Sequence, residues 1–140
     1  MSETLEAPVV PKVDVKGGAI AYVNVDGAVK ARDFYKKAFA AVVAAEHPTD
    51  EQGRTMHIHL YINDGSVMIG DFYPDYGHPF EKPQAFSIML QVDDIDAWFK
   101  RAVEAGCEAV TEPQTMFWGD RYGSVRDPFG VAWAFNQPQA

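Results

Sequence analysis

The sequence has one cysteine, Cys107, no apolar run of membrane-spanning length and no excess of basic residues. A single thiol cannot form a disulfide within the chain, which is typical of proteins in a reducing cytoplasm. A transmembrane helix would need about 20 consecutive apolar residues. The formal net charge of −8 at pH 7 disfavours nucleic acid, whose phosphates repel an acidic surface. We therefore expect a cytoplasmic protein that binds neither nucleic acid nor membrane.

Motifs of phosphate binding and covalent catalysis are missing as well. The P-loop pattern Gly-x-x-x-x-Gly-Lys does not occur, and Gly17-Gly18 only precedes the first predicted strand. Ser87 and Ser124 lie in no nucleophile elbow. Cys107 has no histidine near it in the sequence, which predicts a small buried residue. The sequence thus assigns no catalytic residue.

Length and composition favour one folded unit. The chain has 140 residues, of which 47% are hydrophobic, enough for a sizeable core without a metal or crosslink. Residues 1–17 carry no basic start followed by an apolar run, so we predict a flexible N-terminal tail and no signal peptide. A single domain is predicted over 18–137, with a proline-containing linker at 73–84 between a first module at about 18–72 and a second at about 85–137.

Two segments of the sequence repeat the same order of strand, cap and helix. Val25-Asp26 precedes a helical pattern over about 28–39, and Val92-Asp93 precedes a second one. We expect Asp93 or Asp94 to cap the second helix and Gly106 to end it. One side of that helix is apolar, and we predict that it belongs to the core. Its residues are Ile95, Trp98, Phe99, Ala102 and Ala105.

Alternation along residues 56–62 separates the two faces of a predicted strand. The even-numbered residues are apolar, whereas the odd-numbered ones are His57, His59 and Tyr61. Asn63-Asp64-Gly65 then has the composition of a hairpin turn. One face needs a helix to cover it, and the other either lines a ligand trough or is covered by solvent or a second subunit. The predicted trough lining is Tyr22, Asn24, His57, His59, Tyr61, Ser87, Met89 and Gln91.

The last part of the chain combines a tight turn with an aromatic loop. Asp127-Pro128-Phe129-Gly130 has turn chemistry because proline presets φ and glycine accepts the exit conformation. Trp118, Arg121 and Tyr122 combine apolar area with hydrogen-bonding groups. Such side chains suit a ligand-facing loop, so we place them at the rim of the trough.

Taken together, these motifs resemble the vicinal oxygen chelate superfamily, which includes glyoxalase I, extradiol dioxygenases and the bleomycin and fosfomycin resistance proteins. Within it, the chain is similar to a metal-poor, glyoxalase-like branch. Over roughly residues 18–137, the resemblance implies an α+β fold of two βαβββ modules, with paired, curved mixed sheets and helices on the outer face. It also implies a homodimer. It does not name a reaction, since fold does not fix function.

The resemblance also implies where metal ligands would lie. Those places fall near Ile20 or Tyr22, around 69–71, at Met89 and at Ala134. An alanine cannot bind a cation, and a thioether suits hard or borderline metals poorly. We therefore expect no metal cofactor by the inherited route. The alternative is a relocated site in which His57 and His59, two apart on one strand, bind a divalent metal together with Asp71, or with His78 or Glu81 in its place.

From these observations we predict a metal-independent small-molecule-binding protein, with Trp118 and Tyr122 stacking on the ligand, Arg121 orienting it, and His57 and Tyr61 supplying hydrogen bonds. Two alternatives stay open. One is a divalent-metal-dependent lyase or isomerase of the glyoxalase type that uses the relocated site, or else a dioxygenase. The other is a structural or regulatory subunit whose trough is filled by its own side chains. The predicted ligand-binding residues are Tyr22, His57, His59, Tyr61, Met89, Trp118, Arg121 and Tyr122.

Overall fold

Within residues 13–139, which the computed structural model describes, eight strands and two α-helices follow one another as two copies of a βαβββ order. A 3-10 turn, η1 (Pro74–Tyr76), lies between the copies. The elements of the first copy are β1 (Ala21–Asn24), α1 (Ala28–Ala38), β2 (Val42–Glu46), β3 (Ile58–Ile62) and β4 (Gly65–Gly70). Those of the second are β5 (Ile88–Gln91), α2 (Ile95–Ala105), β6 (Glu108–Thr115), β7 (Arg121–Arg126) and β8 (Ala132–Gln137).

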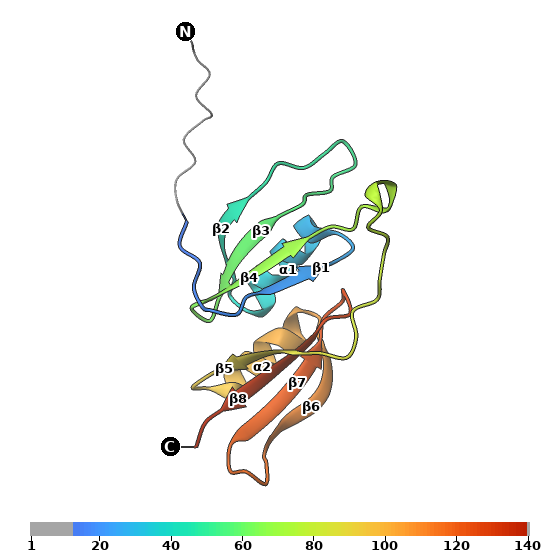
Figure 1. Cartoon of the computed structure of the whole chain (residues 1–140). Helices are drawn as coiled ribbons and strands as arrows, with labels where there is room; N and C mark the ends of the chain where they lie inside the picture. The colour runs from blue at the N-terminus through green and yellow to red at the C-terminus, as the bar shows by residue number, and fades with distance from the viewer. Residues whose placement is uncertain (1–12, 140) are drawn as a thin grey trace.

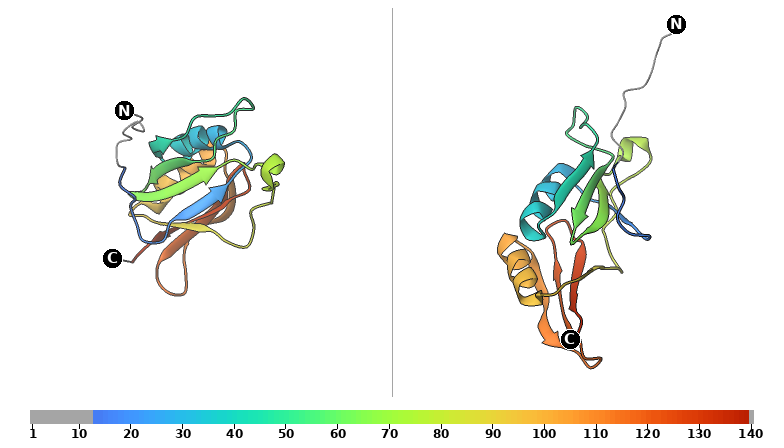
Figure 2. Two further views of the ribbon diagram at one scale, coloured as in Figure 1. Left: turned by 45° about the horizontal axis from the view of Figure 1, so that its top comes forward. Right: turned by 90° about the vertical axis from the view of Figure 1, so that its left-hand side faces the viewer.

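Each copy forms its own four-stranded mixed sheet. The strand orders are β1-β4-β3-β2 and β5-β8-β7-β6, with the first strand of each copy parallel to the last and the other neighbours antiparallel. The two sheets lie one above the other (Figure 1), and both helices cover the same side of the molecule (Figure 2). The predicted α+β fold of two βαβββ modules is confirmed. Neither α-helix among residues 13–139 has the length and apolar character that crossing a bilayer requires.

Local sequence signals position the second helix. The Asp94 side chain accepts a hydrogen bond from the Ala97 amide at 3.2 Å, and the helix ends at Gly106, whose φ of 129° suits a residue without a side chain. The predicted capping aspartate and terminating glycine are therefore both confirmed. The turn at Asp127 is confirmed as well, because the Gly130 amide donates to the Asp127 carbonyl at 3.0 Å.

Each helix also begins at a side chain supplied by the end of the same module. Asp71, directly after β4, accepts hydrogen bonds from the backbone N–H groups of Gly27 and Ala28, each at 2.9 Å from its Oδ1 atom. At the matching position of the second module, Gln137 Oε1 accepts from the Ile95 amide at 2.9 Å. These contacts satisfy helical N–H groups that have no partner within the helix.

A cluster of aromatic side chains joins the two modules. The ring of Phe39, the residue that follows α1, lies 4.4 Å from the Trp133 ring of β8, centroid to centroid, and Tyr35 of α1 lies 5.3 Å from the same ring. The Tyr35 hydroxyl donates to Asp127 Oδ2 at 2.5 Å, and the Trp133 indole donates to the same oxygen at 2.9 Å. Tyr35 and Phe39 belong to the first module, whereas Asp127 and Trp133 belong to the second. The two modules therefore share one core.

The N-terminal segment reaches the first sheet before β1 begins. The Tyr61 hydroxyl donates to the Asp14 carbonyl at 2.6 Å, and the Ser66 amide donates to the Lys16 carbonyl at 2.9 Å. Residues 1–12 of the predicted flexible tail (1–17) lie outside the described residues. The part of that tail around 14–16 is held against β3 and β4 by these bonds, so the tail prediction is wrong there.

Candidate functional site

Tyr22 marks the side of the first sheet that α1 does not cover, which we call the first open face. Along β1, Val23 points into the core and is 6% exposed, whereas its neighbour Tyr22 is 50% exposed. Tyr22 lies beside Met68 across the β1–β4 pair. Its hydroxyl donates to the Met56 carbonyl, which fixes the direction of the ring. A half-exposed aromatic ring held in place in this way is a ready contact for a ligand.

His57, directly before β3, lies next to Tyr22 on this face. Its ring centroid is 5.7 Å from that of Tyr22 and 5.5 Å from that of His47. Partial burial, followed by the positive charges of His47 and His59, lowers the pKa of His57 below its usual value. At neutral pH the imidazole is therefore uncharged, with one nitrogen able to donate a hydrogen bond and the other able to accept one.

The other two residues predicted on this strand face are already engaged. His59 is 3% exposed, and its Nε2 atom lies 2.7 Å from the Ser66 hydroxyl. The Tyr61 hydroxyl is bound to Asp14, and the Lys16 ammonium lies 4.4 Å from the centre of its ring. The N-terminal segment thus covers the part of the first open face around Tyr61. Alternation predicted the shared face correctly, but it could not show that a preceding segment lies on it.

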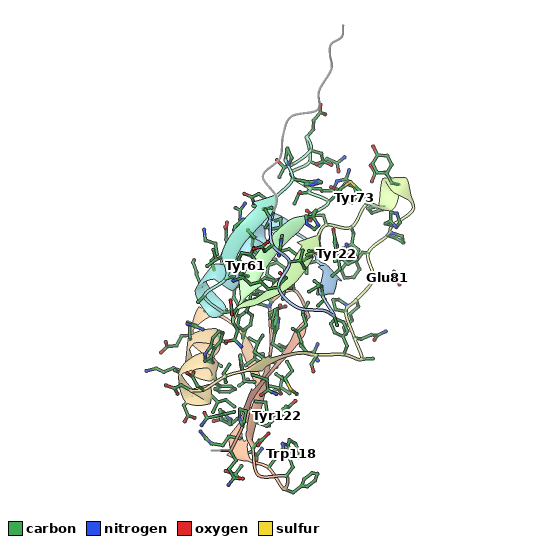
Figure 3. All side chains as sticks on the ribbon, turned by 60° about the vertical axis from the view of Figure 1, so that its left-hand side comes forward. Tyr22, Tyr61, Tyr73, Glu81, Trp118 and Tyr122 are labelled. Atoms are coloured by element: carbon green, nitrogen blue, oxygen red, sulfur yellow. The ribbon has the colours of Figure 1, made fainter. Side chains whose placement is uncertain are left out.

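A hollow of about 350 Å³ adjoins Tyr22 on the side of the module linker. Asn24 of β1 also lines it, together with Glu81 and Lys82 of the linker and Phe86, which precedes β5; Figure 3 labels Tyr22 and Glu81 in this region. Phe86 is 48% exposed, so the hollow has an aromatic wall and charged groups at its edge. Sequence reasoning did not place Glu81 or Phe86 beside Tyr22, because the sequence does not show which distant segment lies against β1.

The corresponding side of the second sheet, opposite α2, is the second open face. Met89 of β5 is 51% exposed on it and lies beside Ala134 of β8. At the far end, the Trp118 ring lies 6.2 Å from the Tyr122 ring and is 48% exposed. Asp120 fixes this loop by accepting hydrogen bonds from the Asn136 side chain at 3.0 Å and the Gln139 amide at 3.1 Å. The predicted pair of Trp118 and Tyr122 is therefore brought together.

Arg121 does not join that pair. Its Nη1 atom donates to Asp96 Oδ2 of α2 at 2.7 Å, so the side chain points to the helical side of the sheet. Tyr122 follows it in the same strand and points to the opposite face, as strand geometry requires. The predicted position of Arg121 on the trough rim is wrong, and the guanidinium links β7 to α2 instead.

The residues predicted to line one trough are divided between two faces of the single chain. Tyr22 and Tyr61 project from the upper sheet, whereas Tyr122 and Trp118 lie at the opposite end of the molecule (Figure 3). Both helices cover the same side, so the open faces lie one above the other and do not face each other within the chain (Figure 2). Alternation identifies which residues share a face, but not how two sheets are oriented.

The donor atoms at the inherited ligand positions do not fit a metal. Tyr22 pairs with Met68, and Met89 pairs with Ala134, at the same relative place in the two sheets. These side chains offer a phenol, two thioethers and a methyl group, whereas divalent metals of this chemistry prefer imidazole and carboxylate. The predicted ligand range 69–71 also needs a correction, since Ile69 is fully buried toward α1.

The relocated metal site finds no better support. Asp71 already accepts three backbone hydrogen bonds, two from the start of α1 and one from the Thr55 amide to Oδ2 at 2.8 Å. Among residues 13–139, no three His, Cys, Asp or Glu side chains gather as a metal-binding group.

Cys107 is unsuited to nucleophilic chemistry, because burial and the nearby Asp127 charge raise the pKa of its thiol to about 12.

Comparisons with known proteins agree with this fold. A family model described as Glyoxalase/Bleomycin resistance protein/Dioxygenase superfamily matches residues 18–135. The uncharacterized protein Rv0887c of Mycobacterium tuberculosis is 39% identical over 132 residues, which are 90% of this chain and 77% of that protein. PA1353 from Pseudomonas aeruginosa has a TM-score of 0.70 at 26% identity, covering 87% of this chain and 98% of its own. TnmS3, an antibiotic binding protein from Streptomyces sp. CB03234, has a TM-score of 0.64 at 25% identity, covering 96% and 100%.

Proposed function

Because the chain belongs to the Glyoxalase/Bleomycin resistance protein/Dioxygenase superfamily, we propose that it is a small-molecule-binding protein that works without a metal and holds its ligand against the first open face. The observation that carries this proposal is the half-exposed Tyr22 ring beside His57, next to a hollow of about 350 Å³. The similarity to TnmS3, which binds an antibiotic, supports ligand binding as the function of such a fold.

The chemistry of the hollow suits a flat organic molecule. Tyr22 and Phe86 provide aromatic surface for stacking, and Asn24 offers an amide. Glu81 and Lys82 lie side by side in the same lining and add one charge of each sign. His57, which contacts Tyr22 outside the hollow, is uncharged at neutral pH and can donate and accept a hydrogen bond. Aromatic surface combined with a few polar groups is typical of a small-molecule site. The same groups supply no electrophile or Lewis acid, so binding alone is the activity that we propose.

A homodimer would complete this site. Tyr22 on the first open face, Phe86 beside it in the hollow and Met89 on the second open face are each about half exposed, with 50%, 48% and 51% of their surface accessible. Large apolar side chains gathered on a sheet face are typical of an interaction surface. If the first open face of one protomer pairs with the second open face of another, the ligand lies between Tyr22 and Trp118 of the partner subunit. This pairing would restore the trough that one chain alone does not close.

A thermal-shift experiment with bleomycin and a panel of planar aromatic antibiotics tests the proposal. At a ligand concentration about 100-fold above Kd, binding stabilises the folded state by about 2.7 kcal/mol, which raises Tm by several degrees. We expect at least one such shift, unchanged after dialysis against EDTA. Tyr22→Ala should abolish it, and Trp118→Ala should weaken it because the partner subunit supplies that ring.

The matched control is Val103→Ala, which shortens a partly exposed apolar side chain of α2, outside both open faces. This variant should keep the full shift. If no compound raises Tm, or if every shift disappears on chelation of metal, the proposed function is wrong. Equal loss in Tyr22→Ala and Val103→Ala would also contradict it, because the ligand would then not lie on the first open face.

A further inference from the structure

A second hollow lies between the β2–β3 connection and the turn that contains η1, beyond His57 at the border of the first open face. Its volume is about 610 Å³, within the range of sites for drug-sized ligands. Met56 and His47 line it from the connection, and Tyr73, Tyr76 and His78 line it from the turn. We call it the turn pocket. It is formed entirely by residues of the first module and the linker, so a single chain contains it complete.

The turn pocket is held in shape by a network of charged hydrogen bonds. Asp50 Oδ1 accepts from the Gln52 and Arg54 amides at 2.9 Å each, which closes the connection on itself. The Arg54 guanidinium then binds Asp75 with two parallel bonds of 2.8 and 3.1 Å, and its Nε atom donates to Asp50 Oδ2 at 2.9 Å. Bidentate pairs of this kind fix geometry as well as charge. A ligand would therefore meet a site that is already formed, which lowers the entropic cost of binding.

The turn itself is braced by its backbone. The Tyr73 amide donates to the His78 carbonyl at 2.8 Å, and the His78 amide donates back to the Tyr73 carbonyl at 2.9 Å. Between these residues, Tyr76 remains 74% exposed, and across the pocket Met56 is 64% exposed. The fold gains little from two large apolar side chains left in water at a braced turn. Their position on opposite sides of one hollow is instead what an apolar, flat ligand requires.

The charges around the turn pocket favour a cation. Asp50 and Arg54 line the pocket, and Asp75, which lines a neighbouring hollow, binds the same guanidinium, so two carboxylates lie around one cationic group. Hydrogen bonds from Arg54 hold the pKa values of both carboxyl groups below their usual range, so they are ionised at neutral pH. The local excess of negative charge has the same sign as the net charge of −8 of the whole chain. The Tyr73 ring already has the Arg54 guanidinium 4.4 Å from its centre, which shows that an aromatic face of this pocket accepts a cation.

From the preformed shape, the exposed aromatic wall and the carboxylates, we propose that the turn pocket is a binding site for planar aromatic cations, with Tyr76 as the stacking residue. This site shares no lining residue with the hollow beside Tyr22 and does not depend on the proposed function. A planar cation would stack on Tyr76, lie against Met56 and place its charge near Asp50. Ligands of the two sites can therefore be bound together or independently.

Fluorescence anisotropy of 9-aminoacridine, a planar aromatic cation, tests the inference on the full chain. We expect saturable binding of one probe per chain, weakened about tenfold by Tyr76→Ala, because a cation–π contact of this kind is worth a factor of about that size. Tyr76→Leu, which keeps apolar bulk without a ring, should weaken binding to a similar extent. Tyr76→Phe should bind like the unmodified protein, and Tyr22→Ala should leave the affinity unchanged.

Two further measurements show whether the site prefers a charged ligand and whether the variants are folded. Acridine, which is uncharged near neutral pH, should bind several-fold more weakly than 9-aminoacridine. Unchanged urea midpoints of the Tyr76 variants would show that a lost affinity reflects the pocket. Absence of saturable binding, equal binding of acridine, or loss in Tyr22→Ala without loss in Tyr76→Ala would each overturn the inference. The last outcome would place the probe on the first open face and leave the proposed function standing.

Discussion

Asp71→Asn is the substitution that separates a structural role of this carboxylate from a role as a metal ligand. The side chain is 7% exposed, and its two oxygens accept three backbone hydrogen bonds. Oδ1 binds the first N–H groups of α1, and Oδ2 binds the Thr55 amide. Asparagine keeps only one acceptor oxygen, and its NH2 group would face a backbone donor at the other position.

The expected loss of stability follows from these contacts. If the remaining oxygen stays at the start of α1, the Thr55 amide loses its acceptor, which costs about 1–3 kcal/mol for a buried donor. Removal of the negative charge beside the helix N-terminus costs about 0.3–1 kcal/mol more. We therefore expect Asp71→Asn to lower the free energy of unfolding by about 2–3 kcal/mol.

Urea denaturation followed by tryptophan fluorescence, at one protein concentration, measures this change. The slope of the free energy against urea should stay constant while the midpoint falls. Asp64→Asn is the matched control, because that side chain is 88% exposed and its ion pair with Lys16 contributes little. Midpoints measured with EDTA or with added zinc should be the same for the unmodified protein. A loss below about 1 kcal/mol, or a midpoint that falls on chelation only when Asp71 is present, would refute the reasoning.

Two further predictions concern buried or partly buried rings. Tyr35→Phe removes the hydroxyl that donates to Asp127 and should lower the free energy of unfolding by about 2 kcal/mol. The control Tyr76→Phe should leave the free energy of unfolding unchanged. A change below about 0.5 kcal/mol in Tyr35→Phe would contradict the role of this bond in joining the modules. The folded state holds the pKa of His57 below its usual value, so the unfolded chain takes up the proton first, and stability falls as the pH drops below the usual pKa of histidine, about 6.5. His57→Gln should therefore reduce the difference between urea midpoints at pH ~7 and pH ~5, and an unchanged difference would show that His57 does not contribute.

Features that depend on neighbouring residues could be predicted from the sequence. The capping Asp94, the terminating Gly106 and the turn at Asp127 each act within a few residues, so the local pattern contains the whole cause. The face shared by His57, His59 and Tyr61 follows from strand geometry in the same way. The family resemblance rested on these local signals and gave the correct α+β arrangement.

Features that depend on distant contacts could not be predicted. Asp71 binds an amide 44 residues earlier in the chain, and nothing beside it in the sequence indicates this role. Asp14 covers Tyr61 across 47 residues, which turned an expected ligand contact into a structural one. Arg121 was placed with Trp118 because the two are close in sequence, although alternation along β7 directs it to Asp96. In each case the missing information was which segment lies against a face.

Because Phe39 of the first module packs on Trp133 of the second, each module completes its core with a ring from the other. If the second half were exchanged for that of a relative, the new partner ring would meet Phe39 and Tyr35 with a different shape, and the aromatic contact would be lost. Substitutions on the two sides of this contact are therefore expected to change together during evolution. The two modules should therefore be exchangeable only together with the rings that pack between them.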